Sequence, residues 1–223
     1  MTKYNYAVVN ATQKPLKMKT ILIVFTKEPV TGEVKTRLGK KIGMDASKWV
    51  YEQLLQHTAQ VSKKSKLKTV VFQNKIANKK NPYFPHALDQ QIQKGKNLGE
   101  KMEAAFHWAF GLGYEKVLLI GSDLWSLGEN TLLEAERALE QKDFVIGPSY
   151  DGGYYLLGLK KIHPQLFKDV PWSTPQVFKK TLLNISDKSV HYLEIANDID
   201  ELEDLKVNRS LYESYQKQFA KNC

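Results

Sequence analysis

The chain has 223 residues, long enough to bury one substantial α/β core. Its formal net charge of +9 favours anionic partners such as nucleotides, although charge alone does not choose among nucleotides, nucleic acid and anionic membranes. No apolar stretch approaches the roughly 20 residues of a membrane span, and the single cysteine, Cys223, excludes an internal disulfide framework and a cysteine-based zinc site.

These exclusions predict a soluble, cytoplasmic protein. Residues 1–17 are polar and mixed, and we interpret them as an N-terminal extension of undefined role. Residues 18–223 are expected to form one domain, because no Pro/Gly/Ser-rich linker divides them. Lysine clusters at 63–66 and 79–80 lack the interleaved aromatic residues of a single-strand binding platform, so nucleic acid is not an expected partner. The sequence leaves the oligomeric state open.

Predicted strands and helices alternate along the chain. Short apolar runs bounded by Gly, Pro and Asn predict strands, and apolar residues at helical spacing predict the helices between them. Strands are expected at 21–25, 69–72, 117–120, 144–146, 154–159 and 190–193. Helices are expected after Asp45, which can cap the first of them, and at 98–110, 130–139 and 175–183, with one last helix from Leu205 to Phe219. This alternation is typical of a largely parallel sheet covered by helices on both faces.

The loop at 27–38, after the first strand, is basic and contains Gly32. It occupies the position of a dinucleotide-binding or Walker A loop and matches neither motif. Lys35 and Arg37 are two residues apart and, as exposed loop cations, could converge on one phosphate pair, with Lys27 as a third cation. A solvated basic loop without a ligand is the alternative.

Two aspartates beside glycines follow predicted strands. Asp123 ends the triplet Gly-Ser-Asp, and Asp151 is followed by Gly152 and Gly153. A carboxylate just beyond the carboxyl end of a buried strand lies where open α/β sheets bind ligands, and its oxygens suit Mg²⁺ or Mn²⁺ carrying phosphates. Alternatively, Asp123 caps the following helix and Asp151-Gly152 forms a hairpin turn.

The segment at 93–100 carries a weaker signal. Asn97 and Glu100 resemble a helix-capping pair, which needs no ligand. Gly95 and Gly99 fit either a close approach of the backbone to a base or ribose, or ordinary turn geometry.

Three further features have two interpretations each. Asp198 and Asp200 begin an acidic cluster that fits the start of a helix or, paired with Asp123, a metal site. Trp172 is either an apolar wall of a binding site or a core residue. The five histidines show no metal-ligand spacing and the chain shows no Ser/His/Asp motif, so a side-chain nucleophile is not expected.

Taken in order, these segments resemble the DUF2064 family, glycosyltransferase-like proteins also called radical-SAM/selenodomain-associated transferase 1, within the GT-A nucleotide-diphospho-sugar transferase superfamily. The resemblance runs from about Ile21 to Leu205. Its carriers are the 27–38 loop, Gln93 with Leu98-Gly99, Gly121-Ser122-Asp123, Gly147-Pro148 through the run 151–159, Trp172-Ser173-Thr174, and Asp198-Ile199-Asp200. The family usually has Pro where Trp125 stands and Thr where Glu201 stands.

The resemblance implies a Rossmann-like GT-A sheet, nucleotide binding by the loop after the first strand, and a metal-binding role for Asp123. The family is also similar to phospholactate guanylyltransferases and molybdenum-cofactor nucleotidylyltransferases. The resemblance therefore does not select which bond is broken.

On this basis the sequence predicts a transferase that depends on Mg²⁺ or Mn²⁺ and uses a nucleotide-activated donor, with a nucleoside-diphosphate sugar as the leading candidate and the acceptor unknown. The alternatives are a nucleotidylyltransferase that joins a nucleoside triphosphate to a phosphorylated acceptor, and a non-catalytic nucleotide- or RNA-binding module. Predicted roles are catalysis for Asp151, Lys35 and Arg37; nucleotide binding for Lys27, Gly32, Lys35, Arg37, Gln93, Gly95, Leu98 and Gly99; acceptor contact for Asp151, Gly152, Gly153, Trp172, Ser173 and Thr174; and metal binding for Asp123, Asp198 and Asp200.

Overall fold

The computed structural model describes residues 18–75 and 81–219 of the chain. The predicted N-terminal extension at 1–17, Lys79, Lys80 and Cys223 lie outside them, so the division of the chain into an extension and one domain stays a prediction. Within the described residues no helix is long and apolar enough to cross a membrane. The predicted cytoplasmic location is not tested by the structure.

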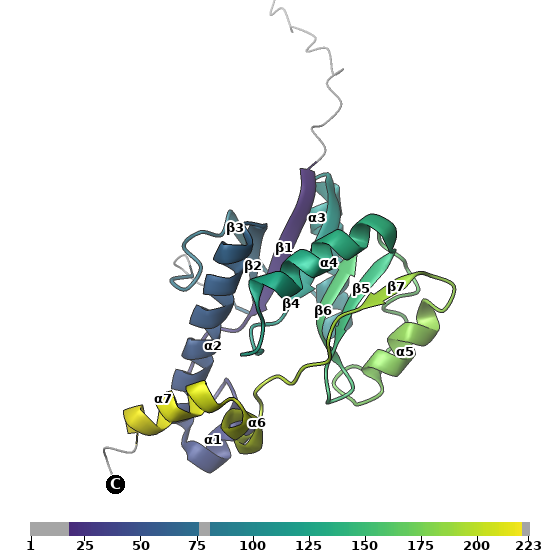
Figure 1. Cartoon of the computed structure of the whole chain (residues 1–223). Helices are drawn as coiled ribbons and strands as arrows, with labels where there is room; N and C mark the ends of the chain where they lie inside the picture. Colours follow the sequence, from purple (N-terminus) through teal and green to yellow (C-terminus); the bar gives the residue numbers. More distant parts are fainter. Residues whose placement is uncertain (1–17, 76–80, 220–223) are drawn as a thin grey trace, which may run out of the picture.

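The described elements form an α/β fold around one seven-stranded sheet (Figure 1). The strands are β1 (Met18–Thr26), β2 (Lys68–Gln73), β3 (Asp89–Ile92), β4 (Tyr114–Ile120), β5 (Phe144–Pro148), β6 (Tyr154–Leu159) and β7 (Val190–Tyr192). The helices are α1 (Thr36–Ile42), α2 (Met44–Ser65), α3 (Leu98–Gly111), α4 (Glu129–Gln141), α5 (Val177–Asn184), α6 (Leu202–Val207) and α7 (Arg209–Phe219).

The sheet is mostly parallel, as the sequence predicts, in the order β3-β2-β1-β4-β6-β5-β7. Strand β6 is the exception and runs antiparallel to both β4 and β5. Only residues 149–153 join β5 to β6, and a parallel crossover needs a dozen or more residues. After β1 the chain adds β2 and β3 on one side of it, then returns to place β4 on the other side. This reversal opens a crevice at the carboxyl ends of β1 and β4, where α/β sheets bind ligands.

Two hydrophobic cores lie on opposite faces of the sheet, because successive side chains of a strand point in opposite directions. In β1, Leu22 and Val24 belong to one core, and Ile21, Ile23 and Phe25 belong to the other. The same alternation continues in β4. Both faces of the central strands are therefore buried, which explains why these strands are apolar throughout.

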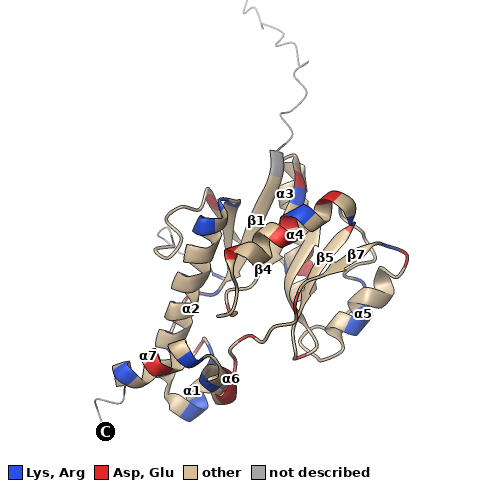
Figure 2. Cartoon of the chain, in the orientation of Figure 1, with Lys and Arg blue, Asp and Glu red and all other residues tan. Residues whose placement is uncertain are grey.

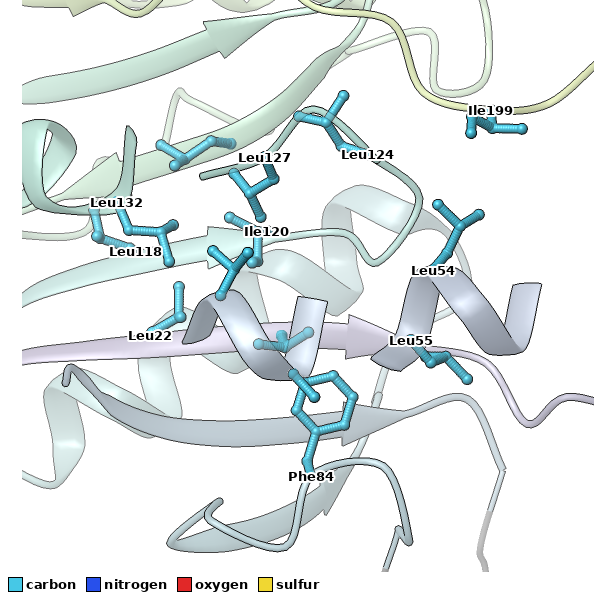
Figure 3. Packing of buried hydrophobic residues seen from close by; sticks show 14 of the residues in the cluster. Leu22, Leu54, Leu55, Phe84, Leu118, Ile120, Leu124, Leu127, Leu132 and Ile199 are labelled. Atoms are coloured by element: carbon cyan, nitrogen blue, oxygen red, sulfur yellow. The ribbon is translucent and has the colours of Figure 1, made fainter. Parts of the chain in front are cut away.

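Helices cover both faces of the sheet. Helices α2, α4, α6 and α7 contribute to the core of one face, and α3 packs on the other together with partly buried side chains of α5. Figure 3 shows the first of these cores close by, with side chains from strands, helices and the loops between them: Leu22, Leu54, Leu55, Phe84, Leu118, Ile120, Leu124, Leu127, Leu132 and Ile199. The predicted doubly covered sheet is confirmed.

Local details differ from the predictions in four places. The sequence pattern missed α1 and β3, which are short and largely polar, and it merged α6 and α7 into one helix. The prediction that Asp45 caps α2 is wrong, since Gly43 is the N-cap residue and Asp45 Oδ1 accepts a hydrogen bond from Thr31 at 3.1 Å. This bond attaches the loop after β1 to the first turn of α2.

Candidate functional site

A cavity of about 800 Å³ lies at the carboxyl ends of β1 and β4. Its walls are the loop after β1, the loop after β4, the hairpin at 149–153, the segment before α5 and the segment at 198–200. Among the predicted site residues, the lining includes Lys27, Lys35, Arg37, Gln93, Leu98, Asp123, Asp151, Gly153, Trp172, Ser173, Thr174, Asp198 and Asp200. Gly32, Gly95, Gly99 and Gly152 do not line it.

Lys35 is held inward at the start of α1. Its backbone is left-handed, with φ of 48° and ψ of 44°, and it precedes the first residue of the helix. The Lys35 Nζ atom lies 2.9 Å from Asp123 Oδ1, and the lysine side chain is only 6% exposed. The expectation that Lys35 is an exposed loop cation is therefore wrong, because α1 directs its side chain into the crevice.

Arg37 lies at the rim of the same site. Its Nη1 atom lies 2.7 Å from Asp200 Oδ2, and the arginine side chain is 70% exposed. Because exposed ion pairs of this kind contribute little to stability, the guanidinium can exchange this carboxylate for a ligand at little cost. Its planar donors match phosphate oxygens in a bidentate way.

The segment at 198–200 reaches the site through backbone contacts. The Ile199 N–H donates to the Asp123 carbonyl oxygen at 3.0 Å, and Ile199 itself is buried in the core. Asp198 is thereby placed close to Asp123. Burial raises the pKa of Asp198 to about 6, with Lys35 opposing and the charges of Asp123 and Asp151 adding to the rise.

Asp200 belongs to the start of α6, as the helix-start interpretation predicts. The Asp204 side chain accepts from the backbone N–H groups of Asp200 at 3.0 Å and Glu201 at 2.7 Å, and Glu201 is the N-cap residue. Glu201, where the family usually has Thr, thus performs a capping role outside the cavity lining. The side chain of Asp200 remains at the cavity through its pair with Arg37.

Asp123 and Asp198 fit a divalent cation that is bound together with phosphates. Carboxylate oxygens are the hard donors that Mg²⁺ and Mn²⁺ prefer, and Mg²⁺ usually takes one or two of them with substrate oxygens and water. In the described part of the chain, no group of three or more His, Cys, Asp or Glu side chains is arranged to hold a metal. The arrangement therefore suits a metal that shares its ligands with the substrate, and the Lys35 ammonium lies beside the same carboxylate.

Asp123 does not cap a helix, so this alternative is excluded. The helix after β4 is α4, and its N-cap residue is Gly128. Trp125, where the family usually has Pro, lies in the intervening loop but does not line the cavity. Its indole N–H donates to Ser210 Oγ at 3.0 Å, and its ring lies 4.7 Å from the His57 ring. Trp125 therefore anchors α7 to the loop after β4.

Asp151 lies in a hairpin turn, as its alternative interpretation predicts, and also lines the cavity. Its Oδ1 atom accepts hydrogen bonds from Ser149 Oγ and, at 2.9 Å, from the Gly153 N–H. Positive φ occurs at Gly152, where it is 85°, and not at Gly153. The Gly152 carbonyl accepts from the Phe178 N–H at 2.8 Å, which fastens the hairpin to α5.

The glycines at 95 and 99 have structural explanations. A Cβ atom on Gly99 would lie 2.3 Å from the Trp172 ring, so this position admits the indole against the first turn of α3. Gly95 has φ of 143°, and a Cβ there would meet the backbone N of Lys101 at 2.7 Å. Asn97 caps α3 by accepting from the Glu100 N–H at 3.0 Å, which confirms the capping interpretation.

Gln93 connects the ends of two strands at the cavity. Its Nε2 atom donates to the carbonyl oxygens of Thr26 and Phe72, both at 3.0 Å. The side-chain nitrogen is thus engaged by the sheet, which leaves the amide oxygen as the atom for a ligand. Leu98, 44% exposed, continues the same wall with apolar surface.

Sequence reasoning did not single out Tyr51. Its hydroxyl accepts from the Lys27 N–H at 2.7 Å and lies 3.1 Å from Ser122 Oγ, so it joins the loops after β1 and β4. Burial raises the pKa of this phenol, with the charge of Asp123 adding to the rise. Tyr51 is one of many buried residues of α2, and only its tertiary contacts distinguish it from the others.

Comparison with known proteins identifies relatives of this fold. A family model described as "Uncharacterized protein conserved in bacteria (DUF2064)" matches residues 55–174. This range is shorter than the resemblance from Ile21 to Leu205 and leaves out both the 27–38 loop and residues 198–200. No curated protein sequence matches the chain.

Solved structures extend the comparison over most of the chain. A protein from Desulfovibrio desulfuricans, proposed to be a nucleotide-diphospho-sugar transferase, is 29% identical with a TM-score of 0.81, covering 89% of this chain and 90% of that one. The 4-diphosphocytidyl-2C-methyl-D-erythritol synthase of Anaerococcus prevotii is 12% identical with a TM-score of 0.59, covering 88% and 97%. A nucleotidyl transferase from Methanothermobacter is 11% identical with a TM-score of 0.57, covering 88% and 99%. The last two, at such low identity, show the fold alone.

Proposed function

The chain belongs to the DUF2064 family, and on that premise we propose that it is a transferase that uses a nucleotide-activated donor. The observation that carries the proposal is the meeting of three loop cations with a group of carboxylates in one cavity at the carboxyl ends of β1 and β4. The proposed activity of the Desulfovibrio protein, which is similar over 89% of the chain, supports the same class.

The donor phosphates are proposed to lie against the loop after β1. Lys27 and Lys35 line the cavity from this loop, and Arg37 lines it from the first turn of α1. Arginine and lysine side chains bind phosphate oxygens, and in a transferase they stabilise the negative charge that grows on the leaving nucleotide. Lys35 is already fixed at the start of α1, so little side-chain entropy is lost when a phosphate binds there.

We propose Asp123 and Asp198 as the residues that hold Mg²⁺ or Mn²⁺, with Asp200 at the rim. When bound, the metal would neutralise donor phosphates and orient them. The chain's own part is to keep two carboxylates adjacent through the Ile199 N–H bond to the Asp123 carbonyl. Asp151, with Ser173 and Thr174 on the same wall of the cavity, is proposed to orient the acceptor.

We place a nucleoside-diphosphate sugar first among donors and keep nucleotidyl transfer from a triphosphate as the second candidate. Both use the same cations and carboxylates, and the two low-identity nucleotidyl- and cytidylyltransferase structures share the fold. An RNA-binding module is disfavoured, because Figure 2 shows Lys and Arg spread over several helices and mixed with Asp and Glu. A continuous basic groove is what single-strand binding requires.

A thermal-shift panel of nucleoside diphosphates, triphosphates and nucleotide sugars, with and without Mn²⁺, tests the proposal. A ligand of the native state raises the unfolding temperature according to its concentration relative to its Kd. We expect stabilisation by at least one nucleotide, stronger with Mn²⁺, and weakened in Arg37→Ala. Release of nucleoside diphosphate from a nucleotide sugar would favour the first donor, and release of pyrophosphate from a triphosphate the second. A panel in which no nucleotide stabilises the protein contradicts the proposal.

A further inference from the structure

The charged side chains divide the cavity into two unlike walls. Its cationic lining residues, Lys27, Lys35 and Arg37, all come from the loop after β1 and the first turn of α1. The opposite wall consists of the hairpin at 149–153 and the segment at 172–177. Among the described residues that line this opposite wall, none is a lysine or arginine, and the charged group is the carboxylate of Asp151.

Two of these cations, Lys35 and Arg37, also have partners that keep them on their own side. Lys35 is paired with Asp123 at 2.9 Å, and Arg37 with Asp200 at 2.7 Å. Asp198 lines the same cavity, near enough for the charges of Lys35, Asp123 and Asp151 to act on it. An anion placed against the hairpin would therefore face the carboxylate of Asp151 on a wall to which no lysine or arginine contributes, which is unfavourable.

The opposite wall is equipped for neutral hydrogen-bonding groups. Asp151 uses Oδ1 for Ser149 Oγ and the Gly153 N–H, and no other described residue is hydrogen-bonded to its Oδ2 atom. That oxygen can accept from the O–H or N–H of a bound molecule. Trp172 and Tyr154 add aromatic surface to the same wall. Flat apolar surface beside a single acceptor favours a polyhydroxylated or amino compound over a dianion.

From this division of charge we propose that the acceptor is a neutral or cationic molecule with a reacting hydroxyl or amine, and not a phosphomonoester. The inference rests on the proposed function. The acceptor oxygen or nitrogen forms a bond to the sugar carbon of the donor, and the bond from that carbon to the diphosphate oxygen breaks. The electron pair leaves with the nucleoside diphosphate, and the acceptor proton passes to the Asp151 carboxylate and then to water.

This assignment separates the two candidate reactions. Joining a nucleotide to a phosphorylated acceptor requires a second phosphate to lie close to the first, and lysine or arginine side chains on the acceptor wall would favour such a pair of anions. In the described cavity the cations lie on one side. A hydroxyl or amine acceptor needs none there.

The experiment uses the full chain and follows the nuclear magnetic resonance signal of the Trp172 indole N–H, which reports on the opposite wall. This signal is identified as the one that is lost in Trp172→Phe. The probes are ethanolamine, glycerol and glucose, each titrated beside its own phosphomonoester, with the loop saturated by methylenediphosphonate and Mg²⁺. We expect at least one unphosphorylated parent to shift the signal at about ten-fold lower concentration than its ester, because the ester adds a charge that the carboxylates repel.

A pair of charge variants sharpens the test. Asp151→Lys supplies the missing cation and should raise the affinity of each phosphomonoester at the Trp172 reporter by about ten-fold. Asp187→Lys makes the same change on an exposed turn outside the cavity and should leave the affinity unchanged. Far-ultraviolet circular dichroism of both variants checks that each is folded.

Two results would overturn the assignment. One is that the phosphomonoesters shift the Trp172 signal at concentrations as low as the unphosphorylated compounds do. The other is that no unphosphorylated compound shifts the signal at any concentration up to its solubility limit. Failure of the proposed function has a separate signature, which is the absence of calorimetric binding of methylenediphosphonate with Mg²⁺ at the loop. The Trp172 titrations remain readable in that case, because they report the opposite wall directly.

Discussion

Lys35 Nζ lies 2.9 Å from Asp123 Oδ1, and this ion pair joins the loop after β1 to the loop after β4. The lysine side chain is 6% exposed, whereas the aspartate side chain is 40% exposed. The Oδ1 atom of Asp123 is itself buried, so the exposed part of the carboxyl group faces the cavity. One aspartate thus has a buried oxygen for the lysine and a second that can reach a ligand.

Asp123→Asn should abolish the metal dependence of nucleotide binding, since the amide lacks the charge that binds a divalent cation. It should also lower stability by about 1–3 kcal/mol, because the buried Lys35 ammonium loses its carboxylate partner. Calorimetric titration with Mn²⁺ and a nucleoside diphosphate measures the first effect, and urea unfolding measures the second. Asp187→Asn, on an exposed turn, is the control. Unchanged metal-dependent affinity would remove Asp123 from the site.

Arg37→Ala should weaken binding of nucleoside di- and triphosphates by about ten-fold while changing stability by less than about 1 kcal/mol, because an exposed ion pair contributes little to folding. Arg209→Ala is the matched control, since Arg209 forms an exposed pair with Glu213 at 2.9 Å outside the cavity. The nucleoside without phosphates should bind both variants equally. If its affinity falls in Arg37→Ala as much as that of the diphosphate, then Arg37 does not contact phosphate.

Asp198→Asn should stabilise the metal-free protein above pH 6. The pKa of Asp198 is raised in the folded state from 3.8 to about 6. The folded protein therefore disfavours the Asp198 carboxylate. The free energy of unfolding is highest when Asp198 is protonated, and it decreases as the pH rises from 3.8 through about 6. The gain should be about 1–3 kcal/mol at pH 8 and should disappear near pH 4.

Thermal unfolding in EDTA at both pH values measures this difference, and EDTA keeps trace metal from binding the carboxylate. Asp187→Asn should show no gain at pH 8, because Asp187 is exposed and paired with Lys188. Equal effects of Asp198→Asn at pH 4 and pH 8 would show that the Asp198 carboxyl group is not perturbed by its surroundings.

Gly99→Ala should destabilise the protein by about 1–3 kcal/mol, because the new methyl group would lie 2.3 Å from the Trp172 ring and the indole would have to move. Gly111→Ala, at the other end of α3, meets nothing within 4 Å and should stabilise the helix by up to about 1 kcal/mol. Chemical denaturation measures the free energy of unfolding of both variants, and the indole signal of Trp172 shows whether its ring has moved. Equal effects at the two positions would contradict the packing of Trp172 on α3.

Gly152→Ala should destabilise the hairpin by about 2 kcal/mol or more. The φ of Gly152 is 85°, and a Cβ there would lie 2.2 Å from the Pro175 carbonyl oxygen. The substitution would therefore strain both the turn and its contact with the segment before α5. Gly153→Ala is the neighbouring control, since its Cβ would meet Asp151 Oδ1 at 3.2 Å without a positive φ. Unfolding curves compare the two. A larger loss at Gly153 would place the left-handed residue of the turn one position later.

The sequence by itself determined the alternation of strands and helices, because buried strands of a parallel sheet are apolar on both faces and show this over short runs. It also predicted Asn97 as a helix cap and offered a hairpin as one of two interpretations of Asp151, since both features depend on side chain to backbone bonds within a few residues. The sequence did not predict α1 and β3, because these short elements are largely polar and show no hydrophobic periodicity.

The tertiary structure alone decided how the polar residues are paired. Lys35 is 88 positions before Asp123, and only the crossing of the chain from one side of β1 to the other brings their loops together. The burial of Lys35, the hydroxyl of Tyr51 between two loops, and the Ile199 bond to Asp123 all depend on this crossing. Spacing along the chain encodes local hydrogen bonds and faces of elements, whereas ion pairs between distant loops are fixed by the order of strands in the sheet.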